Sequence, residues 1–254
     1  MKLGIAVIMI APVAVFLATA ARAAPPEQCE LPDSLIASEV DLARVTAEVK
    51  DKHRLDVTVV GSGSSVLSGP DGVRAAYPAR LEDALKARLP GTDVKVTAHT
   101  QTKESTATMV SGLSKILDDD KPALVIWQAG TVDALNGVEP DEFRSSLDDG
   151  VEQIQGAGAD AILMNMQYSP RTASMLDVST YADIMRVVAE QRDALLFDRL
   201  AIMRYWNDAG TFDLYTATKD YDMARRVHDC IGWALASQII NAAHLDATEN
   251  AITR

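Results

Sequence analysis

Apolar positions along the chain follow two alternating periods. Five short runs of mainly aliphatic residues are bounded by glycine, proline or charged residues, which is the pattern of β-strands. These runs cover residues 55–60, 94–98, 123–128, 161–166 and 194–198. The segments around them have apolar residues one helical turn apart, which is the pattern of amphipathic helices. They cover residues 35–50, 75–89, 105–117, 139–155, 178–192 and 226–243.

This alternation predicts a single α/β domain with three layers, α/β/α, in which helices cover both faces of a five-stranded parallel sheet. The run 123–128 is apolar on both faces, as a central parallel strand must be. Ligands of open parallel sheets bind at the carboxyl ends of the strands. A site is therefore expected in the segments that follow the strands. These are 61–69, 99–104, 129–136 and 167–171, with 219–228 as a late segment that reaches the same edge.

The first 23 residues have the pattern of a secretory signal peptide. Lys2 precedes an apolar run over 3–20, and Ala21-Arg22-Ala23 has the small residues of a cleavage site. We expect cleavage near Ala23 and a periplasmic or secreted protein without a membrane span; the alternative is an uncleaved anchor. The predicted division is a signal peptide over 1–23, an N-terminal segment and helix over 24–53, the main domain over 54–245 and a tail over 246–254.

The two cysteines, Cys29 and Cys230, lie near the two ends of the exported chain. Export favours a disulfide between them, and the alternative is two buried thiols. The four histidines lie far apart and no CxxC motif is present, so no metal site is predicted. The net charge of −12 gives the chain no electrostatic reason to bind nucleic acid or an anionic membrane surface.

The turn GSGSSVLSG over 61–69 follows the first predicted strand. It lacks the third glycine of a dinucleotide-binding fingerprint, because Val66 stands there, and it lacks the Gly-Lys-Ser/Thr of a P-loop. Phosphate binding is therefore disfavoured. Two interpretations remain: a turn that presents a nucleophilic serine to an oxyanion hole, or a plain glycine-rich turn with serines as caps.

Several segments together resemble the SGNH/GDSL hydrolases. The segment GSSVLSG over 63–69 resembles the first block of this family, usually Gly-Asp-Ser-Leu-Thr-x-Gly. Further resemblance covers the segments 77–106, 122–135, 161–171 and 222–236, in the order of the family's blocks. The resemblance implies a flavodoxin-like SGNH-hydrolase fold and a serine esterase that acts on acetyl or acyl esters of small molecules, lipids or polysaccharides. It implies neither a metal nor a cofactor.

The resemblance also assigns roles to single residues. Ser65 falls on the nucleophile, and Ser64 replaces the usual aspartate. The backbone N–H groups of Ser65 and Lys103 fall on oxyanion donors, although Lys103 replaces a glycine. Val132 replaces the asparagine whose side-chain amide completes the oxyanion hole. Losing one such donor costs on the order of 10²–10³ in rate.

The last block departs most from the family pattern, Asp-x-x-His. In one alignment His228 is the base, with Asp222 or Asp229 orienting it. In the other, which we favour slightly, the family histidine falls on Asp222 and its acid on Lys219.

The residues expected to line the substrate cleft are Ser64, Gly130, Val132, Gln167 and Tyr168. Two functions follow from the resemblance. The first is an exported serine esterase. The second, the alternative, is a catalytically degenerate member that binds a ligand or a partner protein in the periplasm, which the replacements at Val132 and in the last block motivate. The sequence favours the first, a serine ester hydrolase.

Overall fold

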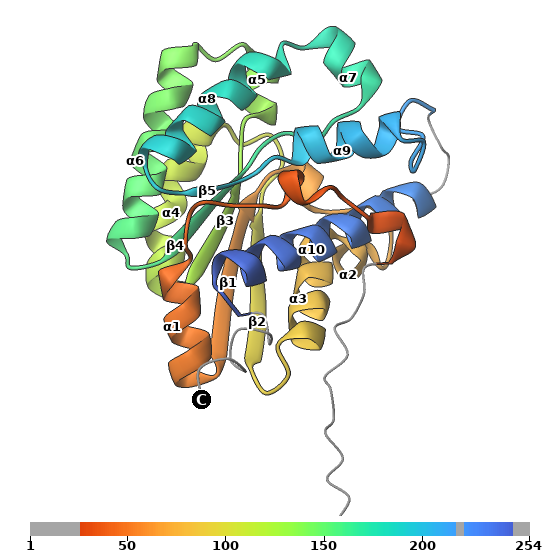
Figure 1. Cartoon of the computed structure of the whole chain (residues 1–254). Coiled ribbons are helices and arrows are strands. Elements are labelled where there is room, and N and C mark those ends of the chain that lie inside the picture. Colours follow the sequence, from red (N-terminus) through yellow and green to blue (C-terminus); the bar gives the residue numbers. More distant parts are fainter. Residues whose placement is uncertain (1–25, 217–220, 246–254) are drawn as a thin grey trace, which may run out of the picture.

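The computed structural model describes residues 26–216 and 221–245. The predicted signal peptide and tail lie outside the described residues. Five parallel strands form one sheet in the order β2-β1-β3-β4-β5 (Figure 1). Their bounds are β1 Arg54–Gly61, β2 Asp93–Thr100, β3 Leu124–Gln128, β4 Asp160–Met164 and β5 Leu195–Phe197.

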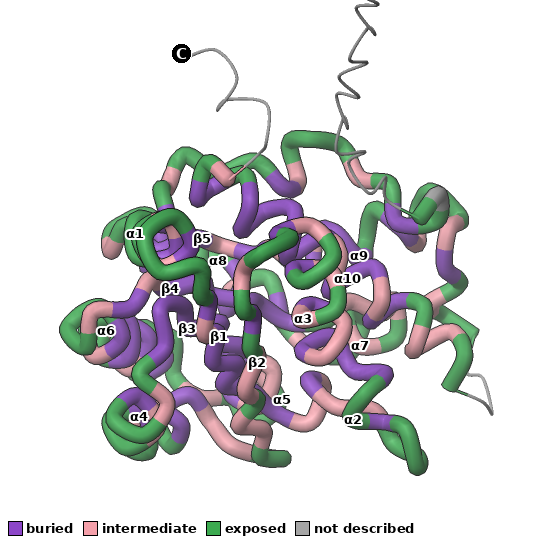
Figure 2. Tube along the Cα trace, turned by 90° about the horizontal axis from the view of Figure 1, so that it is seen from below, coloured by how far each residue is buried: buried purple, intermediate pink, exposed green. Residues whose placement is uncertain are grey.

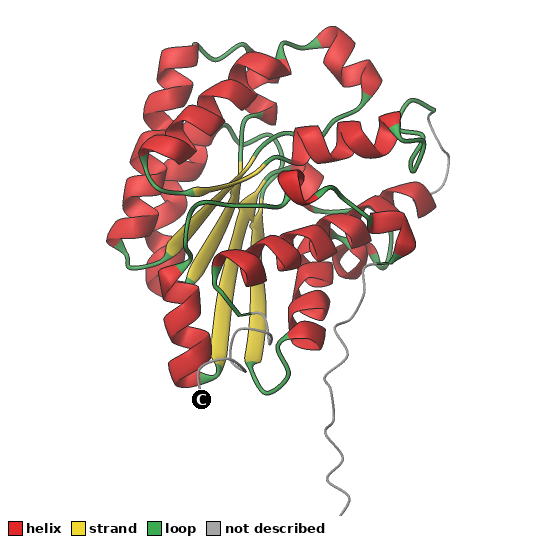
Figure 3. Cartoon of the chain, in the orientation of Figure 1, coloured by secondary structure: helices red, strands yellow, loops and turns green. Residues whose placement is uncertain are grey.

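Helices cover both faces of this sheet (Figure 3). Helices α1, α3 and α10 pack on one face and α4, α6 and α8 on the other. The α-helix bounds are α1 Ala43–Lys52, α2 Gly72–Ala75, α3 Tyr77–Arg88, α4 Thr106–Asp120, α5 Thr131–Asn136, α6 Pro140–Gly156, α7 Pro170–Met175, α8 Val178–Gln191, α9 Arg199–Asp208 and α10 Asp222–Ala242. The predicted three-layer α/β fold with a five-stranded parallel sheet is confirmed.

The core lies between these layers, because alternate residues of each strand point to opposite faces of the sheet. In β3, Leu124 and Ile126 pack toward α1, α3 and α10, whereas Val125 and Trp127 pack toward α4, α6 and α8. All four side chains are fully buried. Figure 2 shows the same division, with buried strands in the middle and exposed outer surfaces on the helices.

The first helix begins later than its apolar spacing predicts. The pattern predicts a helix over 35–50, but residues 33–35 form a short 3-10 turn and α1 begins at Ala43. Just before α1, the backbone N–H of Leu42 donates to the carbonyl of Ala242, 3.0 Å away. A tertiary hydrogen bond to the end of α10 therefore replaces a helical one.

Helix α9 is absent from the prediction based on sequence pattern. The side chain of Asp198 caps this helix by accepting the backbone N–H of Ala201. The buried residues of α9 are Arg199, Leu200, Ile202, Met203 and Trp206, which includes an arginine among apolar side chains. That arginine lies at the carboxyl end of the sheet, directly after β5.

The predicted disulfide between Cys29 and Cys230 is present. It links the 3-10 turn η1, Glu27–Cys29, to α10 across a sequence separation of 201 residues. Closing a loop of this length stabilises the folded state by about 5 kcal/mol in the chain-entropy model. Among the helices of the described residues, none is long and apolar enough to cross a membrane.

Candidate active site at the carboxyl end of the sheet

Segments that follow β1, β2, β3 and β4 surround a cleft of about 710 Å³. Its lining residues include Ser62, Ser64, Lys103, Val132, Leu135 and Gln167, and we call it the carboxyl-end cleft. Ser64, Val132 and Gln167, predicted from the sequence to line a substrate cleft, all lie in this lining. Gly130 and Tyr168, also predicted there, lie outside it.

The glycine-serine turn forms the short 3-10 helix η3, Gly63–Ser65. Ser65 is fully buried, and its Oγ donates to Gln128 Oε1 at 2.7 Å. The hydroxyl of Tyr77 lies 3.2 Å from the same Oγ. A Cβ on Gly61 would approach Ser65 Oγ to 2.3 Å, so glycine is needed for this packing. Ser65 is therefore buried and lies outside the carboxyl-end cleft. It lines a smaller hollow, of about 510 Å³, together with residues of α2, α3 and β2.

Ser64, unlike Ser65, lines the carboxyl-end cleft. Its Oγ accepts a hydrogen bond from Gln128 Nε2 at 2.6 Å and faces a nitrogen of Arg199 at 3.5 Å. The side chain of Gln128 thus joins both serines: its carbonyl oxygen accepts from Ser65 and its amide nitrogen donates to Ser64.

His228 lies in α10 and is almost fully buried. Its Nδ1 accepts the backbone N–H of Tyr77 at 2.9 Å. Burial, together with the positive charge of Arg199, lowers the pKa of His228 to about 3. Across the residues that the structure describes, no hydrogen bond joins His228 to Ser64 or Ser65.

The acids considered as partners of His228 form ion pairs with arginines. Asp222 begins α10, where its side chain is 77% exposed and lies 3.7 Å from Arg225. Asp229 lies 2.8 Å from Arg80. Lys219, at the position of the family acid in the second alignment, lies outside the described residues.

The two positions expected at the oxyanion hole differ in what they provide. Lys103 has a φ of 67°, a left-handed conformation that favours glycine, and it keeps a backbone N–H. Val132 lies in the first turn of α5, lines the carboxyl-end cleft and has no polar side-chain atom. The next residue, Asp133, is buried and accepts from the backbone N–H and the hydroxyl of Thr106.

Arg199, which the sequence reasoning missed, is the least expected group at this site. Its side chain is 1% exposed and its described hydrogen bonds go to neutral oxygens: Gln128 Oε1 at 3.1 Å, Gln167 Oε1 at 3.4 Å, and the Oγ and carbonyl oxygen of Ser64 at 3.5 Å. The guanidinium carbon also lies 5.8 Å from the centre of the Tyr77 ring. The Nε of Arg199 has no hydrogen-bond partner within 26–216 and 221–245. Desolvation lowers its pKa to about 10, so it remains charged at neutral pH.

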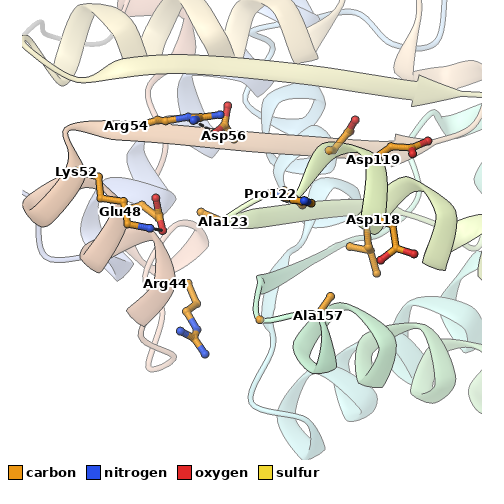
Figure 4. A pocket seen from close by; sticks show the side chains of 14 residues that line it. Arg44, Glu48, Lys52, Arg54, Asp56, Asp118, Asp119, Pro122, Ala123 and Ala157 are labelled. Atoms are coloured by element: carbon orange, nitrogen blue, oxygen red, sulfur yellow. Dashed lines mark hydrogen bonds and ion pairs between the residues drawn. The ribbon is translucent and has the colours of Figure 1, made fainter.

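A larger hollow of about 780 Å³ lies at the opposite end of the sheet, where the strands begin (Figure 4). Charged side chains of both signs line it, and several of them pair with each other, such as Lys52 with Glu48 and Arg54 with Asp56. It lies by the amino ends of the strands, away from the edge where parallel sheets bind ligands. In 26–216 and 221–245, no group of three or more metal-ligating side chains could hold a metal ion.

Comparisons with known proteins agree with this architecture. An arylesterase from Vibrio mimicus is 27% identical over 124 residues, which are 49% of this chain and 60% of the arylesterase. Esterase TesA from Pseudomonas aeruginosa is 26% identical over 141 residues, which are 54% of this chain and 67% of TesA. This chain thus spans about two thirds or less of the length of these relatives.

Solved structures and a family model extend the comparison. A crystal structure of TesA has a TM-score of 0.50 at 25% identity and covers 56% of this chain and 76% of its own. The acetylxylan esterase Axe2 from Geobacillus stearothermophilus has a TM-score of 0.57 at 16% identity, covers 73% of this chain and 94% of its own, and shares the fold. A model of the non-GDSL lipase-like family matches residues 28–245. The chain therefore belongs to the non-GDSL lipase-like family, among the SGNH/GDSL hydrolases.

Proposed function

We propose that this protein binds a ligand in the carboxyl-end cleft of an SGNH-hydrolase fold and does not hydrolyse it. One observation carries the proposal. Ser64 and Ser65 are each hydrogen-bonded to Gln128, and within the described chain neither is hydrogen-bonded to a histidine. A serine hydroxyl is a weak nucleophile unless an adjacent base removes its proton.

His228 is poorly suited to be that base. Because its Nδ1 accepts the Tyr77 N–H, the neutral ring carries its proton on Nε2. Both ring nitrogens are then occupied: one by an accepted hydrogen bond and the other by its own proton. A pKa of about 3 also makes His228 a far weaker base than the near-neutral groups that general-base catalysis uses.

The oxyanion hole is weakened in the same way. Val132 stands where the family has an asparagine, so a side-chain donor is lost. The remaining expected donors are the backbone N–H groups of Ser65 and Lys103. Such a site can hold a carbonyl or an anionic oxygen, but it stabilises a tetrahedral transition state less well.

An assay of ester hydrolysis tests this proposal. Purified protein should hydrolyse p-nitrophenyl acetate no faster than the Ser64→Ala and Ser65→Ala variants do. A rate well above the background that falls at least 100-fold in one of these variants would overturn the proposal and identify the nucleophile.

Ester hydrolysis is the second candidate, and the names of the two esterase relatives favour it. In this alternative Ser65 is the nucleophile, His228 the base and Asp222 its orienting acid, with Ser65 and Lys103 as oxyanion donors. Substrates would be acetyl or acyl esters of small molecules, lipids or polysaccharides. The catalytic step would require Ser65 and His228 to leave their present hydrogen bonds.

Export is part of the proposal. The disulfide between Cys29 and Cys230 is typical of proteins that fold in an oxidising compartment. Together with the leader pattern over 1–23, it supports a periplasmic or secreted protein, where a partner protein is a further possible ligand. N-terminal sequencing of the protein from a periplasmic or culture-medium fraction should begin near Ala24; a start at Met1 would contradict cleavage.

A further inference from the structure

Arg199 places a buried positive charge directly beneath the carboxyl-end cleft. Two residues that it contacts, Ser64 and Gln167, line the cleft. Among the described residues, no carboxylate forms an ion pair with Arg199. A buried charge without a counterion is unfavourable, because desolvation is not repaid by a nearby opposite charge. This arrangement indicates that a negative charge is missing from the site.

Asp198, next to Arg199, and Asp133, next to Val132, are already engaged. Asp198 accepts hydrogen bonds from Asn165 and the N–H of Ala201 and pairs with Arg186. Asp133 accepts from Thr106. Neither carboxylate is hydrogen-bonded to Arg199, and Glu104, next to Lys103, lines a different hollow. Within the described residues none of these acids is therefore the counterion of Arg199.

The guanidinium of Arg199 also orients the polar groups above it. Arginine is only a donor, so it attracts the carbonyl oxygens of Gln128 and Gln167. The amide nitrogen of Gln167 is then directed away from Arg199, and within the described residues it has no acceptor. Ser64 Oγ accepts from Gln128 and faces a donor on Arg199, and its own O–H has no acceptor in the described part of the chain. The side of this network that borders the cleft therefore presents donors.

The remaining lining fits the same polarity. Lys103 lines the cleft and forms no ion pair among the described residues, and no aspartate or glutamate belongs to the lining. This is notable in a chain whose net charge is −12. Val132 and Leu135 add an apolar wall on α5.

We propose that the carboxyl-end cleft binds an organic carboxylate with a hydrocarbon body. The Ser64 hydroxyl, the Gln167 amide and the Lys103 ammonium donate to the carboxylate, and the hydrocarbon packs along Val132 and Leu135. Arg199, beneath Ser64 and Gln167, supplies the balancing charge. The proposal deepens the proposed function, on which it rests, by naming the ligand as a carboxylate that is held without being cleaved.

Calorimetric titration of the disulfide-intact protein with sodium octanoate and with octanamide tests the proposal. The two probes have the same hydrocarbon chain, but only octanoate is charged. The dissociation constant for octanoate should be at least tenfold lower, and added salt should weaken octanoate binding but leave octanamide binding unchanged. Equal binding of the two probes, or binding of neither at millimolar concentrations, would overturn the proposal.

Variants of two lysines, Lys103 and Lys121, test whether octanoate binds in the carboxyl-end cleft. Lys103→Gln should weaken octanoate binding about fivefold or more, and Lys103→Arg should restore most of it. Lys121→Gln is the control: Lys121 also has a left-handed φ, of 47°, but lines the hollow at the opposite end of the sheet. An equal loss in Lys121→Gln and Lys103→Gln would show that binding reflects overall charge and not the carboxyl-end cleft.

Hydrolysis of p-nitrophenyl octanoate separates this inference from the proposed function. Octanoate binding without hydrolysis supports both. Octanoate preference together with hydrolysis that depends on Ser64 or Ser65 contradicts the proposed function and leaves the carboxylate site as a product site. Absence of both the preference and hydrolysis contradicts only the carboxylate inference.

Discussion

Ser65 Oγ lies 2.7 Å from Gln128 Oε1, and both side chains are buried. The serine assigned to nucleophilic attack by family resemblance is therefore a hydrogen-bond donor inside the protein. The same Gln128 side chain also binds Ser64 at the cleft, because its amide nitrogen donates to the Oγ of Ser64. The turn that looks like a nucleophile turn in the sequence belongs here to a polar network built on Arg199.

A structural role for Ser65 predicts a loss of stability in Ser65→Ala. Removing one buried hydrogen bond should lower the free energy of unfolding by about 1–2 kcal/mol, since the carbonyl oxygen of Gln128 loses its shortest contact. Urea denaturation followed by circular dichroism measures this change. Ser68→Ala, in an exposed position of the same turn, is the control and should change stability by less than about 0.5 kcal/mol. Equal stability of the two variants would argue against the structural role.

The low pKa of His228 predicts a loss of stability in acid. Its pKa is about 3 in the folded protein and near 6.5 in the unfolded chain, so the unfolded chain binds the extra proton between these values. The free energy of unfolding should fall by roughly 3 kcal/mol from this group alone between pH 7 and pH 4. Chemical denaturation of wild type and His228→Gln at several pH values measures it.

The variant should show a smaller fall with pH than the wild type. His53→Gln, at an exposed position after α1, should keep the wild-type dependence. The same pH dependence in wild type and His228→Gln would mean that the imidazole is accessible to protons in the folded protein.

Removal of the disulfide should destabilise the protein strongly. The link between Cys29 and Cys230 closes most of the chain, so its removal should cost about 3–5 kcal/mol. Thermal unfolding of the Cys29→Ser, Cys230→Ser double variant, compared with the oxidised wild type, measures the loss. An unchanged melting temperature would show that the remaining contacts between η1 and α10 suffice.

Restoring the missing oxyanion donor should not create an esterase. Val132→Asn returns an amide to the first turn of α5, at the cleft. Because no histidine is hydrogen-bonded to Ser64 or Ser65 within the described residues, hydrolysis of p-nitrophenyl acetate should stay within about twofold of wild type. A rise of about 100-fold, the size of one oxyanion donor, would show that a base is present and only the donor was missing.

The fold follows from local periodicity, and its exceptions have local causes. Strands with apolar residues on both faces and helices with one apolar face predict the layers because each element must bury its apolar surface. The start of α1 could not be predicted from periodicity, since the backbone N–H of Leu42 donates a hydrogen bond to the carbonyl of Ala242, 200 residues away. Helix α9 could not be predicted from periodicity either, because a buried arginine interrupts its apolar face.

The site is less predictable from sequence, because its decisive interactions are long-range. Successive residues of a 3-10 turn point about 120° apart, so Ser64 lines the carboxyl-end cleft and Ser65 does not, although they are neighbours in the family's first block. Gln128 and Arg199 are 71 residues apart, and no local pattern links them. The position of Lys103 did carry a usable signal: glycine is the residue that most readily adopts a left-handed backbone conformation, and the lysine that replaces the family's glycine adopts it here.

Covalent labelling by a fluorophosphonate probe tests the central claim most directly. Such probes react with serines that an adjacent base and an oxyanion hole activate. Intact-mass spectrometry of the folded, disulfide-bonded protein after incubation with the probe should show no added mass, just as for Ser64→Ala and Ser65→Ala. Stoichiometric labelling that disappears in one of these variants would show an active serine hydrolase and contradict the account.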